Sequence, residues 1–186
     1  MESDHIGVGS RLFCTAAPSL DVGVSLKPGD FQQRLMAVQV LAVEVKPIRI
    51  LVPNPAMTGH ALQELAWETV RANEFPDRPS RLSCLFFWRT EGQARDFHSR
   101  RPWPTGLYEA EVTRCDSVFV ADMNRISYFE KAETVESMFK RARRYWSNVC
   151  TEGEVLLRGD ACVTRVLEKG RPVCQPPAVA AGMPAV

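Results

Sequence analysis

The stretch EGEVLLRGDACVTRVLEKG, residues 152–170, decides how the end of this chain folds. Two acidic residues, Glu152 and Glu154, stand one residue apart and directly precede a short apolar run. The pair Gly159-Asp160 interrupts that run, and a second apolar run follows. Because Gly-Asp is typical of tight turns, the pattern predicts two strands joined as a β-hairpin.

The paired acids allow two interpretations. The simpler one is a solvated loop that leads into a buried strand. The other is a catalytic carboxylate on the first residue of a rigid strand, where its position is better defined than on a loop. The residues of this stretch alone leave both open.

Two segments upstream show the spacing of apolar residues that is typical of amphipathic helices. The first is residues 58–73, with a predicted buried face of Leu62, Leu65, Ala66 and Val70, and with Glu64, Glu68 and Arg71 on the other side. The second is residues 134–146, with a predicted apolar face of Val135, Met138, Phe139, Ala142 and Tyr145 or Trp146.

Short runs rich in β-branched and aromatic residues predict several strands. These runs are residues 11–15, 37–45, 48–52, 82–88, 107–112 and, after a Cys115-Asp116 turn, 117–121. Behind the fourth run, Thr90 and Gln93 predict a capping box for a short helix with Ala94 and Phe97 facing inward. Since strands and helices do not alternate regularly, the chain is predicted to be a single mixed α+β domain with two or three helices.

Composition excludes several classes of protein. The chain has 186 residues, 24% of them charged, and a formal net charge of +1, so no overall field attracts nucleic acid or an anionic membrane. Its six cysteines contain no C-x-x-C pair and it has three histidines, so no metal site is expected. It has neither a long apolar segment nor a signal-peptide pattern, which predicts a cytoplasmic protein without a membrane partner.

The helix at residues 134–146 carries a basic cluster of Lys140, Arg141, Arg143 and Arg144. Tyr145 and Trp146 follow it directly, and a basic face with aromatic residues is one form of nucleic-acid interface. The more common explanation is the solvated side of an amphipathic helix, which the near-zero net charge favours.

Four pieces of the chain then occur in an informative order. A strand at Arg11–Thr15 comes first, and Leu85–Thr90 follows with Ala94 and Phe97 on the helix behind it. The strand Leu107–Val112 is third, and the E-x-E pattern of residues 152–154 leads the last strand. Over residues 10–168 this order resembles the catalytic core of the ADP-ribosyltransferase superfamily, especially its small bacterial domains of uncharacterised function.

This resemblance implies an ADP-ribosyltransferase-like split β-sheet core and an NAD-dependent mono-ADP-ribosyltransferase. Such enzymes break the nicotinamide–ribose bond of NAD through a transition state like an oxocarbenium ion. The resemblance implies that Glu154 holds a ribose hydroxyl and faces the developing positive charge. It also implies that Glu152 orients or deprotonates the acceptor.

The resemblance further implies residues that bind NAD. Ser83, Phe86 and Trp88 are expected to line the nicotinamide pocket, where an aromatic face can stack on the ring. Arg81 is expected to pair with a phosphate. Cys14 takes the first-strand position at which the superfamily usually has a His or Arg that contacts the adenosine ribose, so we expect it in the same site. This departure leaves room for an inactive member.

The acceptor implied is an unidentified macromolecule, a protein or a nucleic acid, and the setting is that of a bacterial toxin or an effector delivered into a target cell. Two alternatives remain: an inactive binding module on the same fold, and a nucleic-acid binding protein that uses the basic helix at 134–146. The expected boundaries are a flexible N-terminus at 1–9, the domain at 10–170 and a disordered Pro/Ala-rich tail at 171–186.

Overall fold

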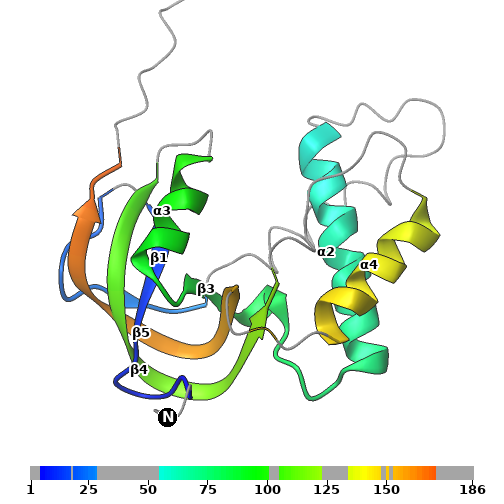
Figure 1. Ribbon diagram of the computed structural model, residues 1–186, viewed down its shortest axis with the longest axis horizontal. Coiled ribbons are helices and arrows are strands. Elements are labelled where there is room, and N and C mark those ends of the chain that lie inside the picture. The colour runs from blue at the N-terminus through cyan, green and yellow to red at the C-terminus, as the bar shows by residue number, and fades with distance from the viewer. Residues whose placement is uncertain are drawn as a thin grey trace, which may run out of the picture.

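Two long antiparallel strands form the frame of the protein (Figure 1). They are β4 (Gly106–Ala121) and β5 (Glu154–Glu168), which pair along their whole length, from Leu107 opposite Glu168 to Ala121 opposite Glu154. The computed structural model describes residues 5–17, 19–28, 55–100, 105–122, 134–147, 150 and 153–170.

Each long strand replaces a pair of strands predicted from the sequence. The predicted hairpin turn at Gly159-Asp160 and the turn at Cys115-Asp116 are both wrong, because the two sites lie opposite each other within the β4–β5 pairing. Two-residue hairpin turns need positive φ angles, which among the described residues occur only at Gly9 and Gly23. The strands bend instead through register shifts on either side of Arg114 and Cys115.

Glycine is required at the bend for a different reason. A Cβ atom on Gly159 would lie 2.0 Å from the backbone oxygen of Arg114. The absence of a side chain therefore lets β5 approach β4 closely at the point where both strands curve.

The remaining strands close the sheet on itself. β1 (Arg11–Ala16) pairs with the first half of β4, and β3 (Leu85–Trp88) pairs with the start of β5. β1 and β3 also pair with each other, so the ring β1–β4–β5–β3 is continuous, and β2 (Ser25–Leu26) adds to the edge of β5. The interior of the ring is filled by Ile6, Leu12, Cys14, Phe87, Tyr108, Ala110, Val112, Val120, Val155, Leu157, Ala161 and Val163.

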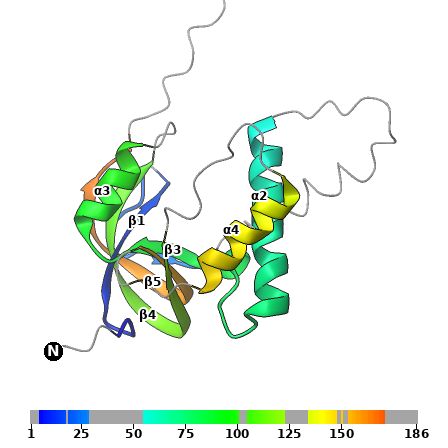
Figure 2. The ribbon, with the colours of Figure 1, turned by 45° about the vertical axis from the view of Figure 1, so that its right-hand side comes forward.

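Two helices cover one part of the outer face of this sheet (Figure 2). They are α2 (Pro55–Glu74) and α4 (Val135–Ser147), which pack against each other and against Phe119 and Leu156. Both helices were predicted, but the buried face of α2 was only partly right. Ala66 and Val70 are buried as expected, whereas Leu65 is 41% exposed, and the residues buried beside them are Gln63 and Trp67.

A third helix, α3 (Glu91–Ser99), covers another part of the outer face. It follows the 3-10 turn η1 (Arg81–Ser83) and β3, and its first turn has the predicted capping box between Thr90 and Gln93. Ala94 is buried as expected, and Phe97 packs on Trp88 with ring centroids 4.3 Å apart. The protein is therefore a single α+β domain with three helices in its described part.

Some expectations lie at or beyond the limits of the described residues. Ile6 is buried with the ring interior and Gly9 donates its N–H to the carbonyl of Val112 at 2.9 Å, so the packed region begins before the expected boundary at residue 10. The predicted strands at 37–45 and 48–52 and the tail at 171–186 lie outside the described residues. None of the described helices is long and apolar enough to cross a membrane.

Candidate functional site

Glu154 is the first residue of β5, and the sheet places it in a row with two aromatic residues. It lies opposite Trp88 of β3, and Trp88 lies opposite Phe13 of β1. Directly opposed residues of neighbouring strands point to the same face of a sheet. Since Val155 and Phe87 point into the ring, Glu154, Trp88 and Phe13 all lie on its outer face.

Glu154 is 4% exposed and sits in a buried ion-pair cluster. Its oxygen Oε2 accepts a hydrogen bond from Nη1 of Arg81 and another from the hydroxyl of Tyr145, the latter at 3.1 Å. Nη1 of Arg81 also donates to the Tyr145 hydroxyl at 2.7 Å. On its other side Arg81 donates from Nε and Nη2 to the two oxygens of Glu64, at 2.9 and 3.0 Å.

Four elements meet at this cluster. η1 supplies Arg81, α2 supplies Glu64, α4 supplies Tyr145 and β5 supplies Glu154. Helices α2 and α4 hold their relative position through apolar packing and a hydrogen bond of 2.9 Å from the indole of Trp146 to the carbonyl of Trp67. Tertiary packing, and not the local sequence, therefore brings these four side chains together.

Burial and charge act in opposite directions on the pKa values of the cluster. Burial disfavours the charged form of Arg81, but the carboxylates of Glu154 and Glu64 outweigh it and hold the pKa of Arg81 well above its ordinary value. Burial also raises the pKa of Tyr145 well above its ordinary value, against the opposing effect of Arg81. Tyr145 is therefore a neutral hydrogen-bond donor to Glu154 at neutral pH.

The formal charges of the cluster do not cancel. Glu64 and Glu154 are two carboxylates, and among the described residues the guanidinium of Arg81 is the positive group that forms ion pairs with them. The three contacting groups thus carry a formal excess of one negative charge in a buried place, where such a charge interacts strongly with an incoming cation.

Aromatic rings surround the guanidinium of Arg81. Its Cζ atom lies 4.9 Å from the ring centroid of Phe86 and 5.3 Å from that of Tyr145. The structure therefore brings three of the expected site residues together, namely Glu154, Arg81 and Phe86. Arg81 was expected to bind a phosphate, but all three of its nitrogens are engaged by protein groups.

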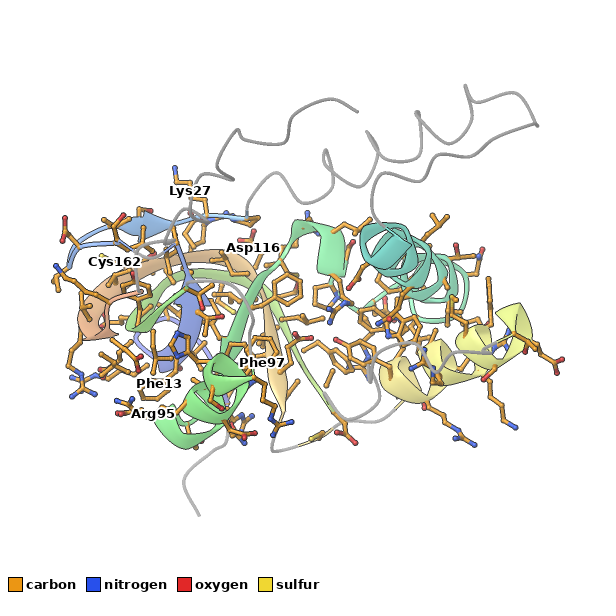
Figure 3. The ribbon with its side chains drawn as sticks, turned by 90° about the horizontal axis from the view of Figure 1, so that it is seen from above. Phe13, Lys27, Arg95, Phe97, Asp116 and Cys162 are labelled. Atoms are coloured by element: carbon orange, nitrogen blue, oxygen red, sulfur yellow. The ribbon has the colours of Figure 1, made fainter. Side chains whose placement is uncertain are left out.

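Trp88 and Ser83 were also expected in the site, but their described contacts are with other residues. Trp88 is covered by α3, and its ring already packs on Phe97, so the ring has a protein partner in place of the expected nicotinamide. Figure 3 shows Phe97 of α3 and Phe13 of β1 on this side of the sheet. Ser83 is half-buried, and its hydroxyl donates to the carbonyl of Ser80, the N-cap residue of η1, at 3.4 Å.

Cys14 does not belong to this face. Strand residues alternate between the two faces, and Cys14 points with Leu12 into the ring interior, away from Glu154. Burial raises the pKa of its thiol to about 12. The β1 residue in line with Trp88 and Glu154 is Phe13, so the expected place of Cys14 in a cofactor site is corrected to an interior position.

Glu152 lies outside the described residues, but the glycine between the two acids is explained. A Cβ atom on Gly153 would lie 2.1 Å from the backbone oxygen of Ala121, at the end of β4. Glycine is therefore required for the chain to enter β5 beside β4. The E-x-E spacing contains a structural glycine, whatever the role of its two carboxylates.

The sequence did not reveal two members of the cluster. Glu64 was assigned to the exposed side of its helix, and Tyr145 was expected only as an apolar core residue. A search for the helical period that includes Gln63 and Trp67 would have placed Glu64 at the edge of the buried face.

The basic helix is partly engaged by other side chains. Nε of Arg143 donates to Glu74 of α2 at 2.8 Å, and Cζ of Arg141 lies 5.4 Å from the ring centroid of Trp67. The described residues contain no group of three or more His, Cys, Asp or Glu side chains able to hold a metal ion.

These features define an α+β protein with a ring-shaped antiparallel sheet and a buried Arg–carboxylate cluster on its outer face. A family model described as "Protein of unknown function (DUF2441)" matches residues 29–169, which is more than half of the chain. The chain belongs to this family. No curated protein matches it.

Proposed function

We propose that the chain is an NAD-dependent mono-ADP-ribosyltransferase in which Glu154 stabilises the developing ribose cation. One observation carries the proposal: Glu154 is a buried carboxylate on the first residue of a strand, and Arg81 and Tyr145 both contact its Oε2. Neither of these two groups engages Oε1, which suits a hydrogen bond from a ribose hydroxyl. A carboxylate held in this way needs little reorganisation during the reaction.

The proposed reaction starts with the bond between ribose C1′ and the nicotinamide nitrogen. This bond breaks and its electron pair leaves with nicotinamide, which becomes neutral. The positive charge that develops on the ribose faces Glu154, and the negative excess of the cluster favours it. A lone pair of the acceptor then forms a bond to C1′, and the acceptor releases its proton to a base, the role proposed for Glu152.

The test is nicotinamide release from NAD by the purified chain and by Glu154→Gln, with and without candidate protein and nucleic-acid acceptors. Glutamine keeps the shape of the side chain and removes its charge. Turnover should fall at least about a hundredfold, since a lost transition-state contact of this kind is worth roughly 3 kcal/mol. Glu168→Gln is the matched control, because Glu168 is a half-exposed carboxylate at the other end of β5.

A second candidate is a binding module on the same fold without catalysis. The observation that favours it is Cys14, which takes the first-strand position of the superfamily's usual His or Arg but points into the ring interior, away from Glu154. Calorimetric binding of NAD to the parent chain without nicotinamide release would support this candidate. Equal turnover of the parent and of Glu154→Gln would refute the proposed role of Glu154.

A further inference from the structure

Arg81 contacts Glu64 through two of its nitrogens and Glu154 through one. A guanidinium has two edges that can each bind a carboxylate through two parallel hydrogen bonds. Glu64 takes one such edge of Arg81, since Nε and Nη2 donate to its two oxygens at 2.9 and 3.0 Å. At the other edge, the described contact with Glu154 runs from Nη1 to Oε2.

Tyr145 contacts the same oxygen of Glu154 as Arg81 does. Its hydroxyl accepts from Nη1 of Arg81 and donates to Oε2 of Glu154, so it links the guanidinium to the oxygen that Arg81 already contacts. The phenol keeps its proton because burial raises its pKa. Both donors therefore converge on one oxygen of Glu154, and the guanidinium is kept from covering the other.

We propose that Glu64 is a positioning residue that acts through Arg81. Its two-point grip holds the guanidinium so that Arg81 orients Glu154 without forming a two-point ion pair with it. Glu64 thereby keeps Arg81 from contacting Oε1 and preserves the negative excess of the cluster. This inference rests on the proposed function, because Oε1 is the oxygen assigned to the ribose hydroxyl.

The position of Glu64 is itself well defined. It lies on α2 directly beside Gln63 and one turn before Trp67 and Glu68, at the edge of the face that packs on α4. Glu68 makes an ion pair of the same kind on the same helix, with Arg71 at 2.8 Å, and its second oxygen accepts from the hydroxyl of Ser80. The chain thus contains a matched pair of half-buried glutamates, and only Glu64 is joined to Arg81 in the described contacts.

The experiment compares Glu64→Gln with Glu68→Gln in two measurements. The first is the crystal structure of each variant. In Glu64→Gln a neutral amide can no longer grip Arg81 through two charged contacts, so Arg81 should turn and contact both oxygens of Glu154. In Glu68→Gln the contact of Arg81 with Oε2 alone should persist. An unchanged Arg81 in Glu64→Gln would overturn the inference.

The second measurement is nicotinamide release, with kcat and KM for NAD determined separately. Glu64→Gln should lower kcat about tenfold or more and leave KM nearly unchanged, because the lost oxygen serves the transition state. Glu68→Gln should keep both constants. A similar fall of kcat in both variants would mean that Glu64 is merely structural.

Failure of the inference and failure of the proposed function can be told apart. If the parent chain releases no nicotinamide, the proposed function fails and takes the catalytic role of Glu64 with it, while the structures still decide whether Glu64 controls Arg81. If the parent is active and Glu64→Gln is equally active, the positioning role alone is refuted.

Discussion

Replacement of Arg81 by methionine tests the buried cluster independently of any activity. Arg81 is 6% exposed and is in direct contact with two carboxylates and one phenol. Methionine keeps an unbranched apolar stem and removes the guanidinium, so Arg81→Met leaves Glu64 and Glu154 buried without their shared counterion. We expect a large loss of stability, mainly from this unpaired charge.

The expected size follows from the contacts. Removal of one partner of a buried ion pair costs about 3–5 kcal/mol. The total stability of a domain is about 5–15 kcal/mol, so Arg81→Met should remove a large share of it. At about 2–4 °C per kcal/mol for a chain of this length, a loss of about 4 kcal/mol lowers the melting temperature by about 8–16 °C.

The assay is chemical and thermal unfolding followed by circular dichroism at several pH values. Without a counterion, a buried carboxylate holds its proton more tightly in the folded than in the unfolded state. The loss of unfolding free energy in Arg81→Met relative to the parent should therefore be largest at about pH 8 and should become smaller as the pH falls toward about 5.

Two control variants identify charge as the cause. Arg158→Met removes an exposed arginine from β5 and should change stability by less than about 0.5 kcal/mol. The triple variant Glu64→Met, Arg81→Met, Glu154→Met removes all three charges and should be more stable than Arg81→Met alone. A loss below about 1 kcal/mol for Arg81→Met, or a triple variant that is the least stable, would refute the reasoning.

Two further predictions concern the sheet. Gly159→Ala should lower the unfolding free energy by about 3 kcal/mol in a denaturation assay, because its Cβ would lie 2.0 Å from the Arg114 carbonyl oxygen. The control Gly92→Ala, with open space around it, should not destabilise the protein. Equal stability of the two variants would contradict the close approach of β4 and β5. Burial raises the pKa of Cys14 to about 12, so iodoacetamide should alkylate it far more slowly at about pH 8 than it alkylates the half-buried Cys162. Peptide mass spectrometry measures the two rates. Comparable rates would show that Cys14 is not in the ring interior.

Much of the local structure follows from the sequence because it depends on neighbours along the chain. The capping box of α3 needs only Thr90 and Gln93 in one turn, and it forms as predicted. The helices at 58–73 and 134–146 were found from their apolar spacing, which reports burial on one side of a helix. The α+β class followed from the order of such segments.

The strand connections were less predictable, because the meaning of a glycine depends on what lies across from it. Gly159-Asp160 has the composition of a tight turn, yet Gly159 is needed for its distance to a backbone oxygen on β4. The same composition is compatible with a turn or with a bend in a long strand. The choice was made by the partner strand, which is more than forty residues away in the chain.

The candidate site likewise has features that follow from the local sequence and features that depend on tertiary contacts. By itself the sequence indicated that a buried strand begins at or directly after Glu154, because an apolar run follows this residue, and the structure begins the strand at Glu154. Only the tertiary structure decided that Arg81, Tyr145 and Glu64 surround this carboxylate, and that Cys14 points away from it. The physical reason is that strand alternation assigns a face once the register is known, while a buried ion pair forms between groups that packing, and not spacing along the chain, brings together.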